Sequence, residues 1–327
     1  MIVGRALRRR IVLRLRFCFV LCALSMTCGA ADEAAVRIGY SKLRISLPVF
    51  VAQENGYFRA EGLRVELVGY DTAQPMMSDL VTSRLDAAGY CAFPITFSAQ
   101  AQTNTRLNYL TLLYEDSKHP ISILIVRRDA KPISRLRDLK GTTIGILPTV
   151  AYRAWLIEAM RKEGVAENEF SIVNIDPNLS STALQSKQVT ALFSNDPAIT
   201  AAKRETGAKD PFGDSLTTRY LENPFPFGSF NVREAFASTH PETTQRVARA
   251  LDKAIEFIRT NPQKAKLMMR PYILPSFQKD VENYPDIAFK LTKDFSNDEL
   301  RSIANQYTTW HIIKQLPDLS NSVYHLP

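Results

Sequence analysis

The alternation of apolar and polar positions divides the chain, from Val36 onward, into short strands and segments of helix length. Val36, Ile38 and Tyr40 recur with a period of two, as in a strand. Residues 47–58 follow helical periodicity and end near Gly56, a residue suited to a helix C-cap. Further strands are predicted at 63–67 and 87–90, and further helices at 74–82 and from Pro94. Such alternation predicts a mostly parallel sheet with helices on both faces.

The same alternation begins again near Ile121, so we expect a second α/β half in this chain of 327 residues. Strands are predicted at 121–126, 143–146, 172–175 and 191–193, and helices at 151–163, 182–188 and 197–206. From Pro241 the chain becomes helical, with helices predicted at 243–260, 262–269 and 298–316.

The first 31 residues have the three parts of a secretory signal peptide. Residues 1–16 carry six arginines and no acid, residues 17–26 are apolar, and the small residues Gly29, Ala30 and Ala31 follow. An apolar run of ten residues is too short to span a bilayer, which needs roughly 20. We therefore expect export to the periplasm, with the general and twin-arginine routes both open. Ser25-Met26-Thr27 makes a poor lipidation signal, which argues against a lipid anchor at Cys28.

Removal of this segment changes the charge and the cysteine content. Without its six arginines the net charge falls from +8 to +2, and nothing then favours nucleic acid as a partner. Cys18, Cys22 and Cys28 lie in the same segment, which leaves Cys91. We therefore expect no internal disulfide and no metal cluster.

Candidate ligand-binding residues lie in the loops where predicted strands end and helices begin. In doubly wound sheets the ligand crevice lies beyond the carboxyl ends of the strands, where helix N-termini present unpaired N–H groups. The candidates are Ser41, Arg44, Asp71, Thr72, Tyr90, Phe93, Thr149, Val150, Tyr152, Arg153, Asn195 and Asp196. The alternative is that Thr149 and Asp196 merely cap helices, and that Tyr90 and Phe93 belong to the core.

The charged candidates are of both signs. Arg44 and Arg153 would grip a carboxylate or sulfonate through paired N–H bonds, whereas Asp71 and Asp196 would hold an amine or an aminopyrimidine. Because both signs are present, a zwitterion or a heteroaromatic ligand is favoured over a simple inorganic anion. The alternative is that all four charges are solvated at the rim of the crevice.

No recognisable catalytic constellation is present in the sequence. No HExxH, GxSxG, P-loop or GxGxxG motif occurs in a fitting context, and Cys91 has no evident histidine partner. We therefore expect no catalytic residues, no cofactor and no bound metal. The chain is predicted not to be an enzyme.

Residues 38–65 read IGYSKLRISLPVFVAQENGYFRAEGLRV. The positions that carry a family resemblance are Pro48, Ala52, Gly56-Tyr57-Phe58, Gly62-Leu63 and Val65. This stretch resembles the opening of periplasmic substrate-binding proteins for nitrate, alkanesulfonates, taurine and thiamine-pyrimidine precursors. Leu139-Lys140-Gly141, followed by a predicted strand, resembles the entry of that family to its second lobe.

The resemblance implies a type II periplasmic-binding fold with a ligand held between two lobes. It places chain crossovers near 117–123 and 228–232, so that 32–120 and 233–327 form lobe 1 and 121–232 form lobe 2. It also implies a monomer that captures a small molecule and delivers it to an ABC permease in the inner membrane. Pro148-Thr149-Val150 and Asn195-Asp196-Pro197 replace the Gly-Ser and Trp-Glu-Pro of many members, which argues against a standard sulfonate or nitrate site.

Two alternatives to a transport receptor stay open. Fungal pyrimidine synthases, which are enzymes of the thiamine pathway, resemble the same opening motif, but they carry a cysteine cluster that this chain lacks. A sensory ligand-binding domain would share the fold and the export signal without serving transport.

Overall fold

The computed structural model describes residues 35–326, which contain two separate β-sheets. The first sheet has six strands, in the order β10 (Ala288–Lys290), β4 (Leu107–Glu115), β9 (Phe225–Arg233), β3 (Ala87–Ala92), β1 (Val36–Ser41) and β2 (Val65–Tyr70). Strand β1 is parallel to β2 and β3, whereas β9 runs antiparallel to β3 and β4. The predicted signal peptide, with Cys28, lies outside the described residues.

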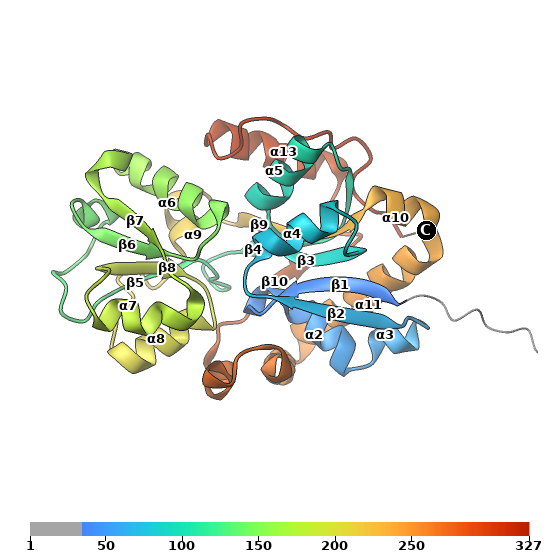
Figure 1. Ribbon diagram of the computed structural model, residues 1–327, viewed down its shortest axis with the longest axis horizontal. Coiled ribbons are helices and arrows are strands. Elements are labelled where there is room, and N and C mark those ends of the chain that lie inside the picture. Colours follow the sequence, from blue (N-terminus) through green and yellow to red (C-terminus); the bar gives the residue numbers. More distant parts are fainter. Residues whose placement is uncertain (1–34, 327) are drawn as a thin grey trace, which may run out of the picture. The chain divides into compact units, whose positions relative to one another are not determined.

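Helices cover both faces of the first sheet (Figure 1). On one face lie α4 (Ala73–Val81) and α5 (Phe93–Thr103), and on the other α2 (Leu47–Glu54), α3 (Tyr57–Ala60) and α11 (Pro241–Thr260). The remaining helices of the C-terminal part are α10 (Glu234–Thr239), α12 (Pro262–Leu267) and α13 (Asn297–Thr309).

The second sheet has four strands, in the order β5 (Ile123–Val126), β8 (Ala191–Ser194), β6 (Thr143–Ile146) and β7 (Ser171–Asn174). Strand β6 is parallel to β7 and β8, and β5 is antiparallel to β8. Figure 1 shows α6 (Val150–Lys162) and α9 (Leu216–Tyr220) on one face, and α7 (Ser180–Gln185) and α8 (Ala198–Thr206) on the other.

The chain passes from the first sheet to the second between Glu115 and Ile123, and it has returned by Phe225, where β9 begins. Strand β9 thus starts upstream of the predicted crossover at 228–232. The lobe boundaries at 120 and 232 stay predictions. No helix among residues 35–326 is long and apolar enough to span a membrane.

Most predicted elements are present, but three predictions were wrong in detail. The single helix at 47–58 is two helices, because Gly56 takes a left-handed backbone with φ of +68°. The last helix ends at Thr309 rather than 316, and β2 spans Val65–Tyr70 rather than 63–67. Strands β4, β9 and β10 were not predicted at all.

Burial explains why β4 and β9 were missed. Nearly every residue of both strands is buried. Neither strand therefore shows the alternation of apolar and polar residues that marks a strand with one solvent-exposed face. These two strands pair with each other in the interior of the first sheet, between β10 and β3. Close packing there also explains why residue 89 is a glycine, since a Cβ at this position would overlap the ring of Phe230.

Candidate functional site

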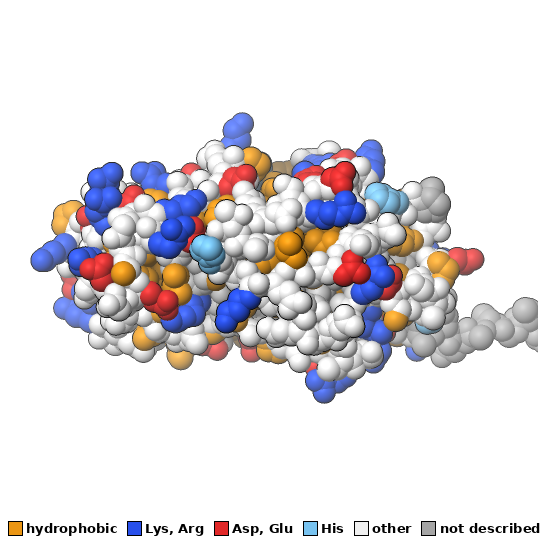
Figure 2. Space-filling view, turned by 90° about the horizontal axis from the view of Figure 1, so that it is seen from above, with side chains coloured by type: hydrophobic (Ala, Val, Ile, Leu, Met, Phe, Trp, Pro, Cys, Tyr) orange, Lys and Arg blue, Asp and Glu red, His pale blue; other side chains and the backbone are white. Residues whose placement is uncertain are grey.

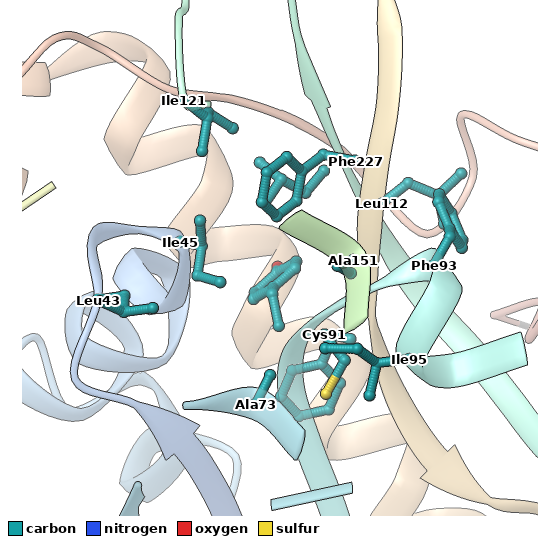
Figure 3. Close-up of a cluster of buried hydrophobic side chains, with 14 of the residues drawn as sticks. Leu43, Ile45, Ala73, Cys91, Phe93, Ile95, Leu112, Ile121, Ala151 and Phe227 are labelled. Atoms are coloured by element: carbon teal, nitrogen blue, oxygen red, sulfur yellow. The ribbon is translucent and has the colours of Figure 1, made fainter. Parts of the chain in front are cut away.

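Loops that follow strands of both sheets meet around the start of α6. Figure 3 shows buried apolar side chains from these loops and their neighbouring strands, which we call the apolar wall: Leu43, Ile45, Ala73, Cys91, Phe93, Ile95, Leu112, Ile121, Ala151 and Phe227. Ala151 belongs to α6, which covers the second sheet, whereas most of the others belong to elements of the first. The strand-end loops of the two halves therefore lie together, as expected for a ligand crevice.

Arg44 is fully buried, with 1% of its surface exposed, and it joins several segments of the chain. Its Nη1 donates hydrogen bonds to the carbonyls of Pro285 (2.8 Å) and Asp286 (3.1 Å), and its Nη2 donates to that of Pro120 (2.7 Å). Three of its N–H groups are thus occupied by backbone oxygens. Burial lowers the pKa of this guanidinium, and the Asp196 carboxylate opposes that effect.

Arg44 also contacts the loop that follows β8. Its Nε lies 3.7 Å from Oδ2 of Asp196, and its backbone N–H donates to the Asp196 carbonyl at 3.3 Å. The other carboxylate oxygen, Oδ1, accepts from the backbone N–H (3.0 Å) and the hydroxyl (2.7 Å) of Thr200 in α8. Asp196 therefore bonds to the first turn of that helix and also faces a buried cation.

Unpartnered polar atoms are concentrated at this place. Five residues, which we call the polar cluster, provide six of the nine buried side-chain nitrogen and oxygen atoms that make no well-aligned hydrogen bond among the described residues. The atoms are Arg44 Nε, Tyr152 Oη, Trp155 Nε1, Asn195 Oδ1, Asn195 Nδ2 and Asp196 Oδ2. Since buried polar groups nearly always have partners, this concentration makes the polar cluster the candidate ligand site.

Electrostatic coupling and ring packing show that the cluster is contiguous. Burial is the main cause that raises the pKa of the Tyr152 hydroxyl, and Glu115, Asn195, Arg44 and Asp196 all modify it. The ring of Tyr152 lies 5.2 Å from that of Trp155 and 4.8 Å from that of Phe193. Trp155 in turn lies 5.0 Å from Phe227 of the apolar wall. The cluster thus combines hydrogen-bonding atoms with flat apolar surfaces.

Sequence reasoning placed four members of the cluster among its candidates but missed Trp155 and the neighbouring Glu115. Trp155 lies three residues after Tyr152 on the same face of α6, a spacing that would have identified it. Glu115 ends β4 with a buried carboxylate that accepts from the N–H groups of Ile121 and Ser122, each at 2.9 Å. The sequence signal that could have identified Glu115 is its place as an acidic residue at the end of an apolar run.

Three candidates from the first half lie outside the polar cluster. The hydroxyl of Ser41 lies 3.2 Å from that of Ser46, and Asp71 forms an exposed ion pair with Lys42 at 3.0 Å. Thr72 occupies the N-cap position of α4.

Two aromatic candidates lie in the core of the first half. The Tyr90 hydroxyl is 2.7 Å from that of Thr111, and Phe93 stacks on Phe97 at 5.0 Å. A ligand role for these residues, as for the other candidates, stays a prediction.

The candidates around α6 have different exposures. The Thr149 hydroxyl accepts from the Tyr152 N–H at 3.2 Å and caps the helix, while Val150 is exposed. Arg153 is half exposed and pairs with Glu167 at 2.6 Å. Of the four charged candidates, Arg44 and Asp196 are therefore buried together, whereas Asp71 and Arg153 face solvent.

A cavity of about 590 Å³ adjoins the apolar wall, since Ile95 contributes to the lining of both. Its other lining residues come from α4, α5, Val150 and residues 312–315.

Basic and acidic side chains are interspersed over the face in Figure 2, with apolar side chains between them. In the part of the chain that the structure describes, no three His, Cys, Asp or Glu side chains gather as metal ligands would.

Comparisons with known proteins agree with this geometry. The chain is 22% identical over 237 residues to an aliphatic sulfonates-binding protein of Bacillus subtilis, described as putative, which covers 70% of this chain and 68% of that protein. It is 21% identical over 226 residues to a 4-amino-5-hydroxymethyl-2-methylpyrimidine phosphate synthase of Aspergillus parasiticus, which covers 67% of this chain and 64% of the synthase. The chain thus spans about two thirds of each relative.

Among solved structures, the periplasmic aliphatic sulphonate binding protein of Escherichia coli superimposes with a TM-score of 0.68 at 17% sequence identity. The match covers 89% of this chain and 98% of that one, which confirms the predicted two-lobe periplasmic-binding fold. The model of the family described as "NMT1/THI5 like" matches residues 45–265, more than half of the chain. The predicted resemblance is therefore confirmed, and the chain belongs to the NMT1/THI5-like family.

Proposed function

We propose that this chain is an exported solute-binding protein, which captures a small organic molecule between its two lobes and delivers it to an ABC importer. The polar cluster carries the proposal. Arg44 follows a strand of the first sheet, whereas Asn195 and Asp196 follow a strand of the second, so a ligand at the cluster would contact both lobes. Ligand contacts with both halves would favour the closed arrangement over an open one.

The buried reactive groups support binding rather than catalysis. Cys91 is fully buried, and burial raises the pKa of its thiol well above the usual range, which disfavours the nucleophilic thiolate. Glu115 and Arg44 are engaged by surrounding protein groups. We therefore infer that the chain is not an enzyme and uses no cofactor, although one relative is named as a synthase.

The cellular setting follows from the sequence and the relatives. The E. coli protein of the same fold is named as periplasmic, and the first 31 residues have the pattern of a signal peptide. Removal of that segment would release a monomeric receptor into the periplasm. Its partner there would be the permease of an importer in the inner membrane.

Fluorescence of the two tryptophans tests capture at the polar cluster. Trp155 belongs to the cluster, whereas Trp310 packs on Phe225 at 5.8 Å beside α13. A ligand found by thermal shift should change the emission of the wild type and of Trp310→Phe, but not that of Trp155→Phe. At a hundredfold excess over Kd it should also stabilise the protein by about 2.7 kcal/mol. Turnover of small molecules without any saturable binding would contradict the proposal.

A further inference from the structure

The proposed function leaves open which ligand charge the polar cluster accepts, and the bonds of Arg44 answer that question. A carboxylate or sulfonate is normally held by two parallel N–H bonds from a guanidinium. Here Nη1 donates to Pro285 and Asp286, Nη2 donates to Pro120, and Nε faces Asp196. Three of its five N–H groups are therefore taken by backbone carbonyls, and a ligand anion at Nε would compete with the Asp196 carboxylate.

The balance of buried charge points the same way. Arg44 and Lys266 are the buried basic side chains among the residues that the structure describes, and each faces a carboxylate. Lys266 pairs with Asp286 at 2.7 Å. Around the cluster, Arg44 is accompanied by both Asp196 and Glu115, which act on its pKa as nearby acids. An anionic ligand would therefore meet two carboxylates and one cation that is already paired.

The unpartnered atoms themselves describe the complementary ligand. Asp196 Oδ2 and Asn195 Oδ1 can accept hydrogen bonds, whereas Asn195 Nδ2, beside the Tyr152 hydroxyl, and Trp155 Nε1, beside the Tyr307 hydroxyl, can donate them. A side-chain amide pairs with a ligand edge that carries an N–H donor next to an acceptor, as a carboxamide or an amino-substituted heterocycle does. The rings of Tyr152 and Trp155 would hold a flat ligand of this kind.

We propose that the polar cluster selects a flat ligand without negative charge, which donates N–H bonds to Asp196 and Asn195, and that it rejects sulfonate, carboxylate and nitrate ions. This inference rests on the proposed function and deepens it. It separates the chain from its sulfonate-binding relatives.

Matched pairs of small molecules test the charge preference by isothermal titration calorimetry. Nicotinamide with nicotinate, and benzamide with benzenesulfonate, keep the ring and change the charge of its substituent. We expect at least one amide to bind about tenfold or more tightly than its anionic counterpart. An anion that binds as tightly as its amide overturns the inference but leaves solute capture intact. If neither amide binds and a thermal-shift screen yields an anionic ligand, the inference is overturned; if that screen yields no saturable ligand at all, the proposed function itself fails.

Substitution of Asp196 by asparagine gives a second test, because it removes the negative charge at constant size. In Asp196→Asn the amide-to-anion affinity ratio should fall by about tenfold or more, since Arg44 then has no facing carboxylate. The matched control is Asp71→Asn, whose side chain is exposed and pairs with Lys42. Circular dichroism should show both variants folded. An unchanged ratio in a folded Asp196→Asn overturns the inference.

Discussion

Glu115 connects the two halves of the chain, and its replacement by alanine should destabilise the protein more than the loss of an ordinary surface charge. Its Oε2 accepts from the N–H groups of Ile121 and Ser122, each at 2.9 Å, and from the Ser215 hydroxyl at 2.5 Å. Its Oε1 accepts from the hydroxyls of Ser122 (2.6 Å) and Thr217. One carboxylate thus holds the crossover after β4 against the start of α9.

The expected cost can be worked out bond by bond. In Glu115→Ala the Ile121 N–H keeps the Ser215 hydroxyl as acceptor at 2.9 Å. The Ser122 and Thr217 hydroxyls, 2.6 Å apart, can bond to each other. The Ser122 N–H loses its carboxylate, which costs about 1–3 kcal/mol for a buried donor. With the cavity left by the side chain, we expect a loss of about 2–4 kcal/mol in the free energy of unfolding.

Urea unfolding followed by circular dichroism measures this loss, with Glu167→Ala as the control. Glu167 is exposed and pairs with exposed Arg153, so its removal should cost no more than about 1 kcal/mol. Equal midpoints for Glu115→Ala and Glu167→Ala would refute the reasoning, because the crossover would then not depend on the buried carboxylate.

Three further predictions concern other residues. Burial, together with the Asp79 carboxylate that accepts its hydroxyl at 2.6 Å, raises the pKa of Tyr70 to about 12. This contribution to stability is complete below the unfolded pKa of about 10 and is lost as the pH rises toward 12, so wild type should lose stability over that range more steeply than Tyr70→Phe in urea titrations. Cys91 should resist labelling by iodoacetamide in the folded protein and react only in urea, since it is fully buried; fast labelling without urea would contradict its placement. Arg153→Ala should leave ligand affinity unchanged in calorimetry, because Arg153 is exposed and paired with Glu167; lost binding would instead indicate an anion held at the surface.

Short strands bounded by turn residues and amphipathic helices were predictable from the sequence, whereas the long buried strands β4 and β9 were not. The strand at 143–146 was predicted from the turn Lys140-Gly141 before it, and the helix now seen at Val150–Lys162 from its amphipathic periodicity. Strands β4 and β9 show no alternation of apolar and polar residues, because they are interior strands of the first sheet with helices on both faces. Pro226 and Gly228 further disguise β9, since both residues are uncommon inside strands.

The site was predictable as a set of loops but not as a set of contacts. The rule that ligands bind beyond strand ends led to Arg44, Tyr152, Asn195 and Asp196. The sequence could not show that Arg44 donates to carbonyls from residues 120, 285 and 286, because those contacts depend on segments far apart in the chain. The same long-range contacts decide which charged candidates are buried and which are exposed.

The central claim is that a small molecule binds at the polar cluster, and the Kd of Asn195→Leu tests it most directly. The ligand for this calorimetric measurement is whichever amide of the matched pairs binds wild type most tightly. Gln102→Leu serves as the control, because Gln102 lines the cavity beside α4 and α5 and not the cluster. The account predicts that Asn195→Leu weakens binding about tenfold or more, since both amide atoms lose their bonds, while Gln102→Leu binds like wild type. Full affinity in Asn195→Leu, with binding lost in Gln102→Leu, would contradict it.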